Sequence, residues 1–379
     1  MLYFDHNATT PVAPEVADAF HAAVCDIWGN ASSIHRSGQH AREALEHSRR
    51  TVAQFLGASA NEIVFTSGGT ESNNLAILGL VRNLPGTHRH VITSTIEHPA
   101  VLGPIEQLER EGIAVTRAGV QHDGVVDVDQ VLQSIRPETV FISLMHANNE
   151  AGTLQPLRQV AAIARERGIF LHSDGVQAAG RIPVDVRELG VDLYSLSGHK
   201  FYAPKGVGAL YVRKGTPLHG IQFGGQHERE RRAGTENVAG AVALARATAL
   251  PSIDVSSLRN SFESHIATEL KDIQINGRTA PRVPNTSNVT FRRISGEAFV
   301  IALDILGMAV STGSACSSGS TEPSHALLAM GLTREEARST VRFSFGRYNT
   351  TEDVRKLADA VVATARRMRK QVLPEVSYA

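Results

Sequence analysis

The chain has 379 residues, of which 42% are hydrophobic, and its 38 Lys and Arg residues balance 38 Asp and Glu residues. A chain of this length is expected to form two or three structural units, with enough residues to bury a core without disulfide bridges. The zero formal charge argues against a nucleic-acid-binding protein, which would normally carry a basic surplus.

The N-terminal segment MLYFDHNATTP has no basic region and carries Asp5 where a signal peptide would be apolar. Because no run of about 18 apolar residues occurs, we expect no membrane span. Only two cysteines are present, Cys25 and Cys316, which excludes a disulfide scaffold and a Cys-rich metal site held by this chain alone. We therefore expect a soluble α/β protein of a reducing compartment, the cytoplasm.

Short apolar runs alternate with helical patterns between residues 60 and 213. The predicted strands, in chain order, are Ile63–Thr66, His90–Thr95, Ile113–Arg117, Thr139–Met145, Ile169–Ser173, Leu193–Leu196 and Gly208–Val212. Helices are predicted between them, as at Glu71–Val81 and Leu157–Glu166. This alternation predicts an α/β fold with a mostly parallel sheet, and ligands of such sheets gather at the carboxyl ends of the strands.

The pattern changes after residue 250, where prolines interrupt the chain at Pro251, Pro281 and Pro284. Later elements are predicted as strands at Val289–Arg293, Met308–Thr312 and Val341–Phe345, and a final helix from Thr351 to about Arg369, capped by Thr350 or Thr351. We expect a large domain over residues 15–250 and a smaller α+β domain made of residues 1–14 and 251–379.

Lys200 gives the strongest single chemical signal, because it follows the apolar strand Leu193–Leu196 in the sequence Ser-Gly-His-Lys. An amine at the carboxyl edge of a sheet can form a Schiff base with a carbonyl cofactor. Taken alone, it is equally compatible with a surface lysine in a loop, which is the commoner case.

Four other predicted strands end in residues that suit the same chemistry. The glycine-rich turn Ser67–Asn73 opens a helix whose free N–H groups can hold a phosphate. Asp174 can pair with a pyridinium nitrogen, with Gln177 one turn later, and His98 and Asn148 follow two further strands. Taken alone, the glycine-rich turn is only a plausible helix cap, Asp174 is better explained as a cap, and a strand-end histidine such as His98 is usually structural, but together these residues form one constellation.

This constellation resembles that of the pyridoxal-phosphate (PLP) enzymes of fold type I, specifically the cysteine desulfurases of the NifS/IscS kind within the class V aminotransferases. The similarity runs over nearly the whole chain, from DHNATTP at residues 5–11 through GNASSIH at 29–35 and RERRAGTEN at 229–237 to RFSFGRY at 342–348. It implies the PLP-dependent transferase fold of type I, with a large and a small domain.

The resemblance implies that Lys200 forms the Schiff base with PLP and that Asp174 pairs with the pyridine nitrogen. His98 would stack on the ring and take part in proton transfer. Asn148 and Gln177 would bond the ring 3-oxygen, and the phosphate would be held by Gly69, Thr70, Ser197 and His199. Thr235 would reach the phosphate in the neighbouring subunit of a homodimer. Arg342 and Asn148 would bind the substrate carboxylate.

Cys316 lies in a Gly- and Ser-rich stretch, residues 310–320, that is expected to be an exposed loop. The resemblance implies that its thiolate takes the sulfur of L-cysteine as a persulfide, leaves L-alanine, and passes the sulfur to a scaffold or carrier protein, as in iron–sulfur cluster assembly. Cys25 lies in an amphipathic helical segment and is expected to be a packing or an incidental residue.

The alternatives are a selenocysteine lyase, a small aminotransferase, and a non-catalytic assembly hub. An aminotransferase has no need of Cys316, and a hub has no need of the strand-end residues. No metal site is expected, since the 16 histidines include no H-E-x-x-H or Cys–His cluster. The chain departs from the family at Gln226 and Glu230, where the family often has glycine.

Overall fold

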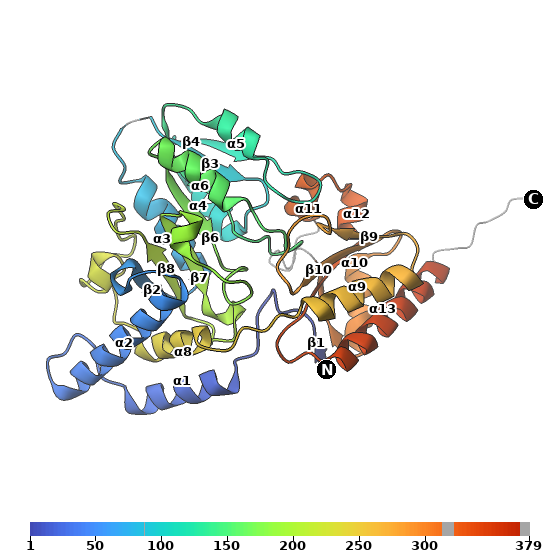
Figure 1. Cartoon of the computed structure of the whole chain (residues 1–379), viewed down its shortest axis with the longest axis horizontal. Helices are drawn as coiled ribbons and strands as arrows, with labels where there is room; N and C mark the ends of the chain where they lie inside the picture. Colours follow the sequence, from blue (N-terminus) through green and yellow to red (C-terminus); the bar gives the residue numbers. More distant parts are fainter. Residues whose placement is uncertain (87, 313–321, 372–379) are drawn as a thin grey trace, which may run out of the picture.

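The computed structural model describes residues 1–86, 88–312 and 322–371 (Figure 1). A seven-stranded sheet organises the larger part, and only β8 runs antiparallel to its neighbours. In spatial order its strands are β2 (Ile63–Thr66), β8 (Gly208–Val212), β7 (Leu193–Ser197), β6 (Phe170–Asp174), β5 (Thr139–Ser143), β3 (His90–Ser94) and β4 (Ala114–Ala118). The predicted α/β class with a mostly parallel sheet is confirmed.

Helices cover both faces of this sheet because its strands are apolar on both sides. Val64, Val91 and Leu193 pack with α3 and α4, whereas their neighbours Ile63, Ile92 and Tyr194 belong to the core that includes α2, α6 and α8. The helices of this part are α1 (Pro14–Asp26), α2 (Arg36–Phe55), α3 (Gly69–Val81), α4 (Pro99–Arg110), α5 (Val128–Ser134), α6 (Leu157–Glu166), α7 (Val186–Leu189) and α8 (Val238–Thr248).

A smaller antiparallel sheet forms beside it, in the order β12 (Ser311–Thr312), β13 (Thr340–Ser344), β10 (Thr286–Phe291) and β9 (Ile273–Asn276). Its helices are α9 (Ser256–Glu269), α10 (Gly296–Ile305), α11 (His325–Ala329), α12 (Arg334–Arg338) and α13 (Thr351–Gln371). In Figure 1, α9 and α13 lie side by side along this sheet, and the N-terminus lies near them. Phe4 packs in the same core as Phe262 and Phe343, so the first residues of the chain join this smaller part.

Two expectations for this part differ from the structure. The predicted strand Met308–Thr312 is divided: β11 (Met308–Ala309) pairs with β1 (Leu2–Tyr3), and β12 pairs with β13. Strand β10 begins three residues before the predicted Val289, because the buried Asn288 is hydrogen-bonded, accepting from Asn276 Nδ2 at 2.7 Å. The division into residues 15–250 and the remainder stays a prediction. Among the described residues, no helix is long and apolar enough to span a bilayer.

Candidate active site

A cavity of about 440 Å³ opens where the strands of the large sheet end, and we call it the strand-end cavity. It brings together most of the predicted site residues, although they come from distant parts of the chain. Its lining includes Gly69, Thr70, His98, Asp174, Gln177, Ser197, His199 and Lys200, together with Ala8, Asn73, Asn149 and Lys205.

Lys200 stands in the single turn Gly198–Lys200 directly after β7. Its Nζ donates to the carbonyl oxygens of Asn7, at 2.7 Å, and of Ala8, at 2.8 Å. The N-terminal segment therefore crosses the end of the sheet and holds the amine at the wall of the cavity.

Asp174 is the last residue of β6, and only 6% of its surface is exposed. Its Oδ2 accepts a hydrogen bond from Asn73 Nδ2 at 2.8 Å, and its Oδ1 accepts one from the Val176 N–H at 3.0 Å. A Cβ on the next residue, Gly175, would lie 2.0 Å from the ring of Tyr194, so only glycine lets the chain turn here. The sequence-based assignment missed Asn73, although it lies four residues after Gly69 and thus one turn along the same helix face.

The turn at Gly69 brings the start of α3 close to the end of β7. A Cβ at Gly69 would lie 2.7 Å from Cγ2 of Val176 and 3.4 Å from Cβ of Ser197, so the backbone forms the cavity wall there. The first N–H groups of a helix have no acceptor inside it and attract anions. This end of the cavity therefore suits a phosphate.

Glu71 places a carboxylate near this phosphate-binding end, and an ion pair with Arg232 balances its negative charge. Its Oε1 accepts from Arg232 Nε at 2.9 Å, and its Oε2 accepts from the Ser67 N–H at 2.8 Å. Burial acts to raise the pKa of Glu71, but the hydrogen bonds from Arg232 and Ser67 outweigh it and hold the pKa below its usual value. The carboxylate thus remains charged and paired.

Two histidines of the cavity have a hydrogen-bond partner at one ring nitrogen. His98 caps α4, and its Nδ1 accepts from the Ala100 N–H at 3.0 Å, so this nitrogen carries no proton. His199 Nδ1 lies 3.1 Å from the hydroxyl of Thr9. Burial, followed by the positive charges of neighbouring Lys and Arg side chains, lowers the pKa of His199 to about 4, so the ring is neutral at pH 7.

Asn148 does not line the cavity, which differs from its predicted role at the ring oxygen and at the substrate. It is 1% exposed, and its Oδ1 accepts from the N–H groups of Glu150, at 2.9 Å, and Ala151, at 2.8 Å. Its side chain therefore stabilises the turn that follows β5. The next residue, Asn149, lines the cavity instead. Sequence alone does not decide between two adjacent asparagines, because the turn determines which of them faces inward.

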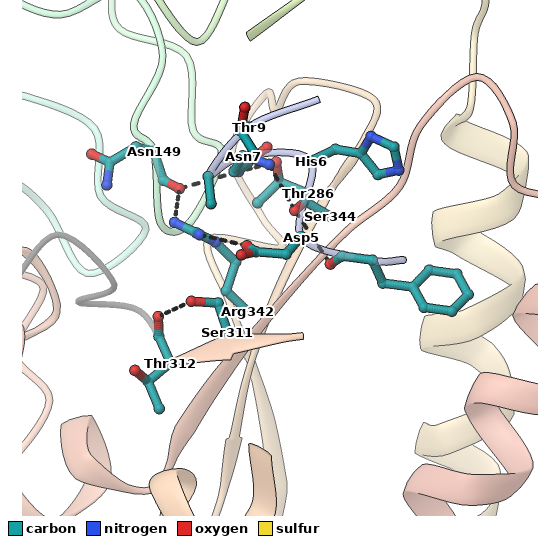
Figure 2. A network of polar contacts seen from close by, with 12 residues as sticks. Asp5, His6, Asn7, Thr9, Asn149, Thr286, Ser311, Thr312, Arg342 and Ser344 are labelled. Carbon is teal, nitrogen blue, oxygen red and sulfur yellow. Dashed lines mark hydrogen bonds and ion pairs between the residues drawn. The ribbon is translucent and has the colours of Figure 1, made fainter. Parts of the chain in front are cut away.

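Gln177 reaches the N-terminal segment as well as the cavity. Its Nε2 donates to the carbonyl oxygen of Asn7 at 3.0 Å, and its Oε1 accepts from Arg181. Asn7 in turn donates from Nδ2 to Thr286 Oγ1, at 2.9 Å, and from its N–H to Ser344 Oγ, at 2.9 Å. Figure 2 shows Asn7 between these two residues of the smaller sheet and Asn149, whose carbonyl oxygen it also reaches, at 3.1 Å, and which lines the strand-end cavity.

Arg342 lies on β13 beside the cavity and is 2% exposed. Its Nη2 forms an ion pair with Asp5 Oδ1 at 2.9 Å, and its Nη1 donates to the carbonyl oxygen of Asn149 at 3.0 Å (Figure 2). Its Nε is buried with no partner among the described residues. The guanidinium is thus held rigidly at the edge of the site with donor capacity to spare.

Two buried carboxyl groups, each next in sequence to a residue that lines the cavity, were not predicted. Glu97 Oε1 accepts from Ser94 Oγ at 2.6 Å and from the Met145 N–H at 3.0 Å, while burial raises the pKa of Glu97 to about 8. Burial likewise raises the pKa of Glu150 to about 7, against the opposing influence of Ser324 and Arg342.

Thr235 is exposed and does not line the strand-end cavity of its own chain. The loop before it is pinned by Glu228, whose carboxylate accepts from Arg49 Nη1 at 2.6 Å and Nη2 at 2.8 Å. Residues Glu228 to Glu230 all have positive φ angles, 45°, 57° and 66°. Glycine adopts such angles freely, which explains why glycine suits position 230 and why this chain needs the buried ion pair to hold the turn.

The segment that contains Cys316 lies outside the described residues. Cys25 is exposed on α1, with its Sγ 3.9 Å from Nε2 of His21, so it is not a packing residue. Within the described ranges, no group of His, Cys, Asp and Glu side chains is arranged to hold a metal ion.

Comparison with known proteins finds similar sequences and structures over nearly the whole chain. The family model described as aminotransferase class-V matches residues 2–357. A cysteine desulfurase IscS of Dictyoglomus turgidum is 44% identical over 375 residues, which cover 97% of this chain and 95% of that protein. Among solved structures, a NifS-like protein superposes with a TM-score of 0.89 at 35% identity, covering 96% of this chain and 98% of that one. The structure of SspA in complex with cysteine superposes with a TM-score of 0.84 at 37% identity, covering 92% and 100%.

Proposed function

The chain belongs to the aminotransferase class-V family, and on this basis we propose that it is a PLP-dependent cysteine desulfurase. It converts L-cysteine to L-alanine and carries the sulfur as a persulfide on Cys316. The observation that carries this proposal is the strand-end cavity, where an amine and a buried carboxylate face a phosphate-binding helix start. Similarity to a protein whose structure holds cysteine supports L-cysteine as the substrate.

The chemistry of the residues in this cavity fits PLP. Lys200 supplies an amine for a Schiff base, Asp174 supplies a buried carboxylate for the pyridine nitrogen, and Gly69, where a Cβ would collide with Val176, brings bare backbone to the cavity wall. Ser197, His199 and Thr70 would share the phosphate, while Gln177 and Asn149 would bond the ring oxygen. When bound, PLP supplies an electron sink for the bond changes at the substrate Cα.

The side chains of this chain would then bind the substrate and transfer its protons. Arg342 orients the substrate by its carboxylate, using N–H groups that Asp5 and Asn149 leave available. The amine of Lys200 would remove the proton from Cα and return one later. His98 takes part in proton transfer through Nε2, since its Nδ1 is occupied by the Ala100 N–H.

The sulfur step is balanced without an external oxidant. The Cys316 thiolate attacks the substrate sulfur, an S–S bond forms, and the bond between Cβ and sulfur breaks with its electron pair left on carbon. The carbon skeleton takes up protons to become L-alanine, while the sulfur remains on the protein as a persulfide. A second thiol, on a scaffold or carrier protein, then receives it, for instance for iron–sulfur cluster assembly.

We propose a homodimer in the cytoplasm as the active unit, with Thr235 reaching the phosphate in the neighbouring subunit. Thr235 is exposed at the end of a loop that the Arg49–Glu228 ion pair fixes, which supports a role outside its own chain.

The test is the location of the transferred sulfur. After brief exposure of the holoenzyme to L-cysteine, mass spectrometry should find one added sulfur atom on Cys316. Cys316→Ser should abolish alanine release, because a hydroxyl cannot form a persulfide, while the exposed-cysteine control Cys25→Ser keeps it. Sulfur found on Cys25, or alanine formed by Cys316→Ser at the parent rate, overturns the proposal.

A further inference from the structure

A second cavity, of about 310 Å³, lies on the other side of Lys200 and the N-terminal segment. We call it the linker cavity, because the chain that joins the two sheets, Leu250–Ile253, forms one of its walls. Its volume lies at the small end of the range of ~300–1,000 Å³ that is typical of ligand pockets. The other walls come from residues 180–184, from Phe201 and Tyr202, and from Gly346 and Arg347.

The charge of this cavity is one-sided. Arg181, Lys200 and Arg347 line it, and among the described residues no Asp or Glu does so. Arg181 donates only to neutral oxygens, those of Gln177 and the His6 carbonyl, the latter at 3.1 Å. Across the described ranges, neither Arg181 nor Arg347 has a carboxylate within ion-pair distance. At Arg181 and Arg347 the cavity therefore has positive charge that no carboxylate among the described residues balances.

Burying a cation without an anionic partner is unfavourable. Burial indeed lowers the pKa of Arg181 to about 10, and the positive charge of Arg342 adds to the effect. Arg347 is half-buried, with its guanidinium carbon 5.1 Å from the ring centre of Tyr202, and it donates to the carbonyl oxygen of Pro251 at 3.3 Å; in the described part of the chain its contacts are neutral as well. An anion in the cavity would offset the burial of Arg181 and could pair with Arg347.

A buried histidine ring adds an unused polar group. His6 lines the cavity and is 3% exposed, and its Nδ1 has no hydrogen-bond partner among the described residues. Burial lowers the pKa of His6 to about 4, so the ring is neutral at pH 7 and offers a hydrogen bond without adding charge.

The rest of the lining is apolar. Phe55 and Phe201 stack with their ring centres 6.1 Å apart, and Ile182 and Leu250 also line the cavity. Such walls favour a ligand with an apolar body over a bare inorganic ion.

From these observations, we propose that the linker cavity binds a small organic carboxylate. Its charged group meets Arg181 and Arg347, and its apolar body lies against Phe55, Phe201 and Leu250. This binding uses neither Cys316 nor L-cysteine, so it is independent of the proposed desulfurase activity.

The test is isothermal titration of the holoenzyme with benzoate, with benzamide as the neutral analogue and inorganic phosphate as the anion that lacks an apolar body. Benzoate should bind one site per chain at least roughly tenfold more tightly than either control. Arg181→Gln and Arg347→Gln should each weaken benzoate binding about tenfold or more, and Thr248→Phe should block it by filling the cavity. Thermal unfolding checks that each variant is folded.

The matched control lies in the other cavity. Arg342→Gln removes a guanidinium beside the strand-end cavity and should leave benzoate affinity unchanged. The proposal is overturned if benzoate does not bind the parent protein, if benzamide binds equally well, or if Arg342→Gln alone abolishes binding while Arg347→Gln and Thr248→Phe do not affect it.

Discussion

The strand-end cavity and the linker cavity share Lys200 and are separated by the N-terminal segment, yet they differ in how charge is balanced. In the strand-end cavity each acidic group has its own partner: Asp174 accepts from Asn73, and Glu71 accepts from Arg232. The linker cavity contains cations and, in the described part of the chain, no acid. The acidic groups of the strand-end cavity are thus held in place before a cofactor binds. In the linker cavity, by contrast, an anionic ligand would balance the positive charge.

The N-terminal segment, residues 6–10, contributes to the walls of both cavities. Ala8 lines the strand-end cavity, while His6 and Thr10 line the linker cavity. Residues 6 to 8 form a turn, in which the Ala8 N–H donates to the Asp5 carbonyl oxygen at 3.0 Å, and this turn lets side chains two positions apart face different cavities. The carbonyl oxygens of Asn7 and Ala8 hold Lys200 at the boundary.

The largest expected effect comes from removing that lysine. Lys200→Ala should lower alanine formation from L-cysteine by at least roughly 10⁴-fold, because both the covalent link to PLP and the proton carrier at Cα disappear. Borohydride reduction of the parent holoenzyme followed by peptide mapping should place the pyridoxyl group on Lys200.

The control for this prediction uses the other cavity. Thr248→Phe alters only the linker cavity and should keep activity within about twofold of the parent. A pyridoxyl label on Lys205, which also lines the strand-end cavity, would contradict the assignment of Lys200.

A smaller loss is expected at Asp174. Asp174→Asn keeps one of the two acceptor oxygens, so it retains the hydrogen bond from Asn73 Nδ2 or from the Val176 N–H but not both, and it removes the negative charge that keeps a pyridine nitrogen protonated. Turnover should fall by about 10² to 10³-fold, and PLP should be lost more readily on dialysis, as its absorbance will report. Parent-like turnover in a fully loaded Asp174→Asn enzyme would show that another group supplies this charge.

Much of this site was predictable because parallel strands end at one edge of a sheet. The apolar runs before Asp174, Lys200 and His98 identified the strands, and the ends of those strands identified the cavity. What lies in turns was harder: Asn148 and Asn149 differ only in the direction that the turn gives them. The linker cavity had no signal at all, because its cations come from separate turns that meet only in the folded chain.

Asp5 should act by positioning Arg342, with an effect on substrate affinity rather than on chemistry. Asp5→Ala removes the partner of Arg342 Nη2, frees the guanidinium to move, and should raise the KM for L-cysteine about tenfold while kcat changes less than about threefold. Asp5→Asn retains an acceptor oxygen and should recover most of the loss. Steady-state kinetics of both variants checks the prediction, and an equal fall of kcat in both would contradict a positioning role.

The smallest expected effect concerns stability and the buried Glu97. Burial raises the pKa of Glu97 from 4.5 to about 8, so between these values the folded protein holds a proton that the unfolded chain has released. The stability from this proton is present below pH 4.5 and is lost as the pH rises through about 8, at a slope of at most about 1.4 kcal/mol per pH unit. Glu97→Gln keeps the bonds from Ser94 and Met145 but does not titrate, so its urea midpoint should decline less than the parent midpoint between pH 6.5 and 8.5. Buried histidines such as His172, whose pKa burial lowers to about 3, affect stability only at lower pH, so they do not obscure this window. Parallel midpoint curves for the two proteins would show that Glu97 is already charged in the folded state.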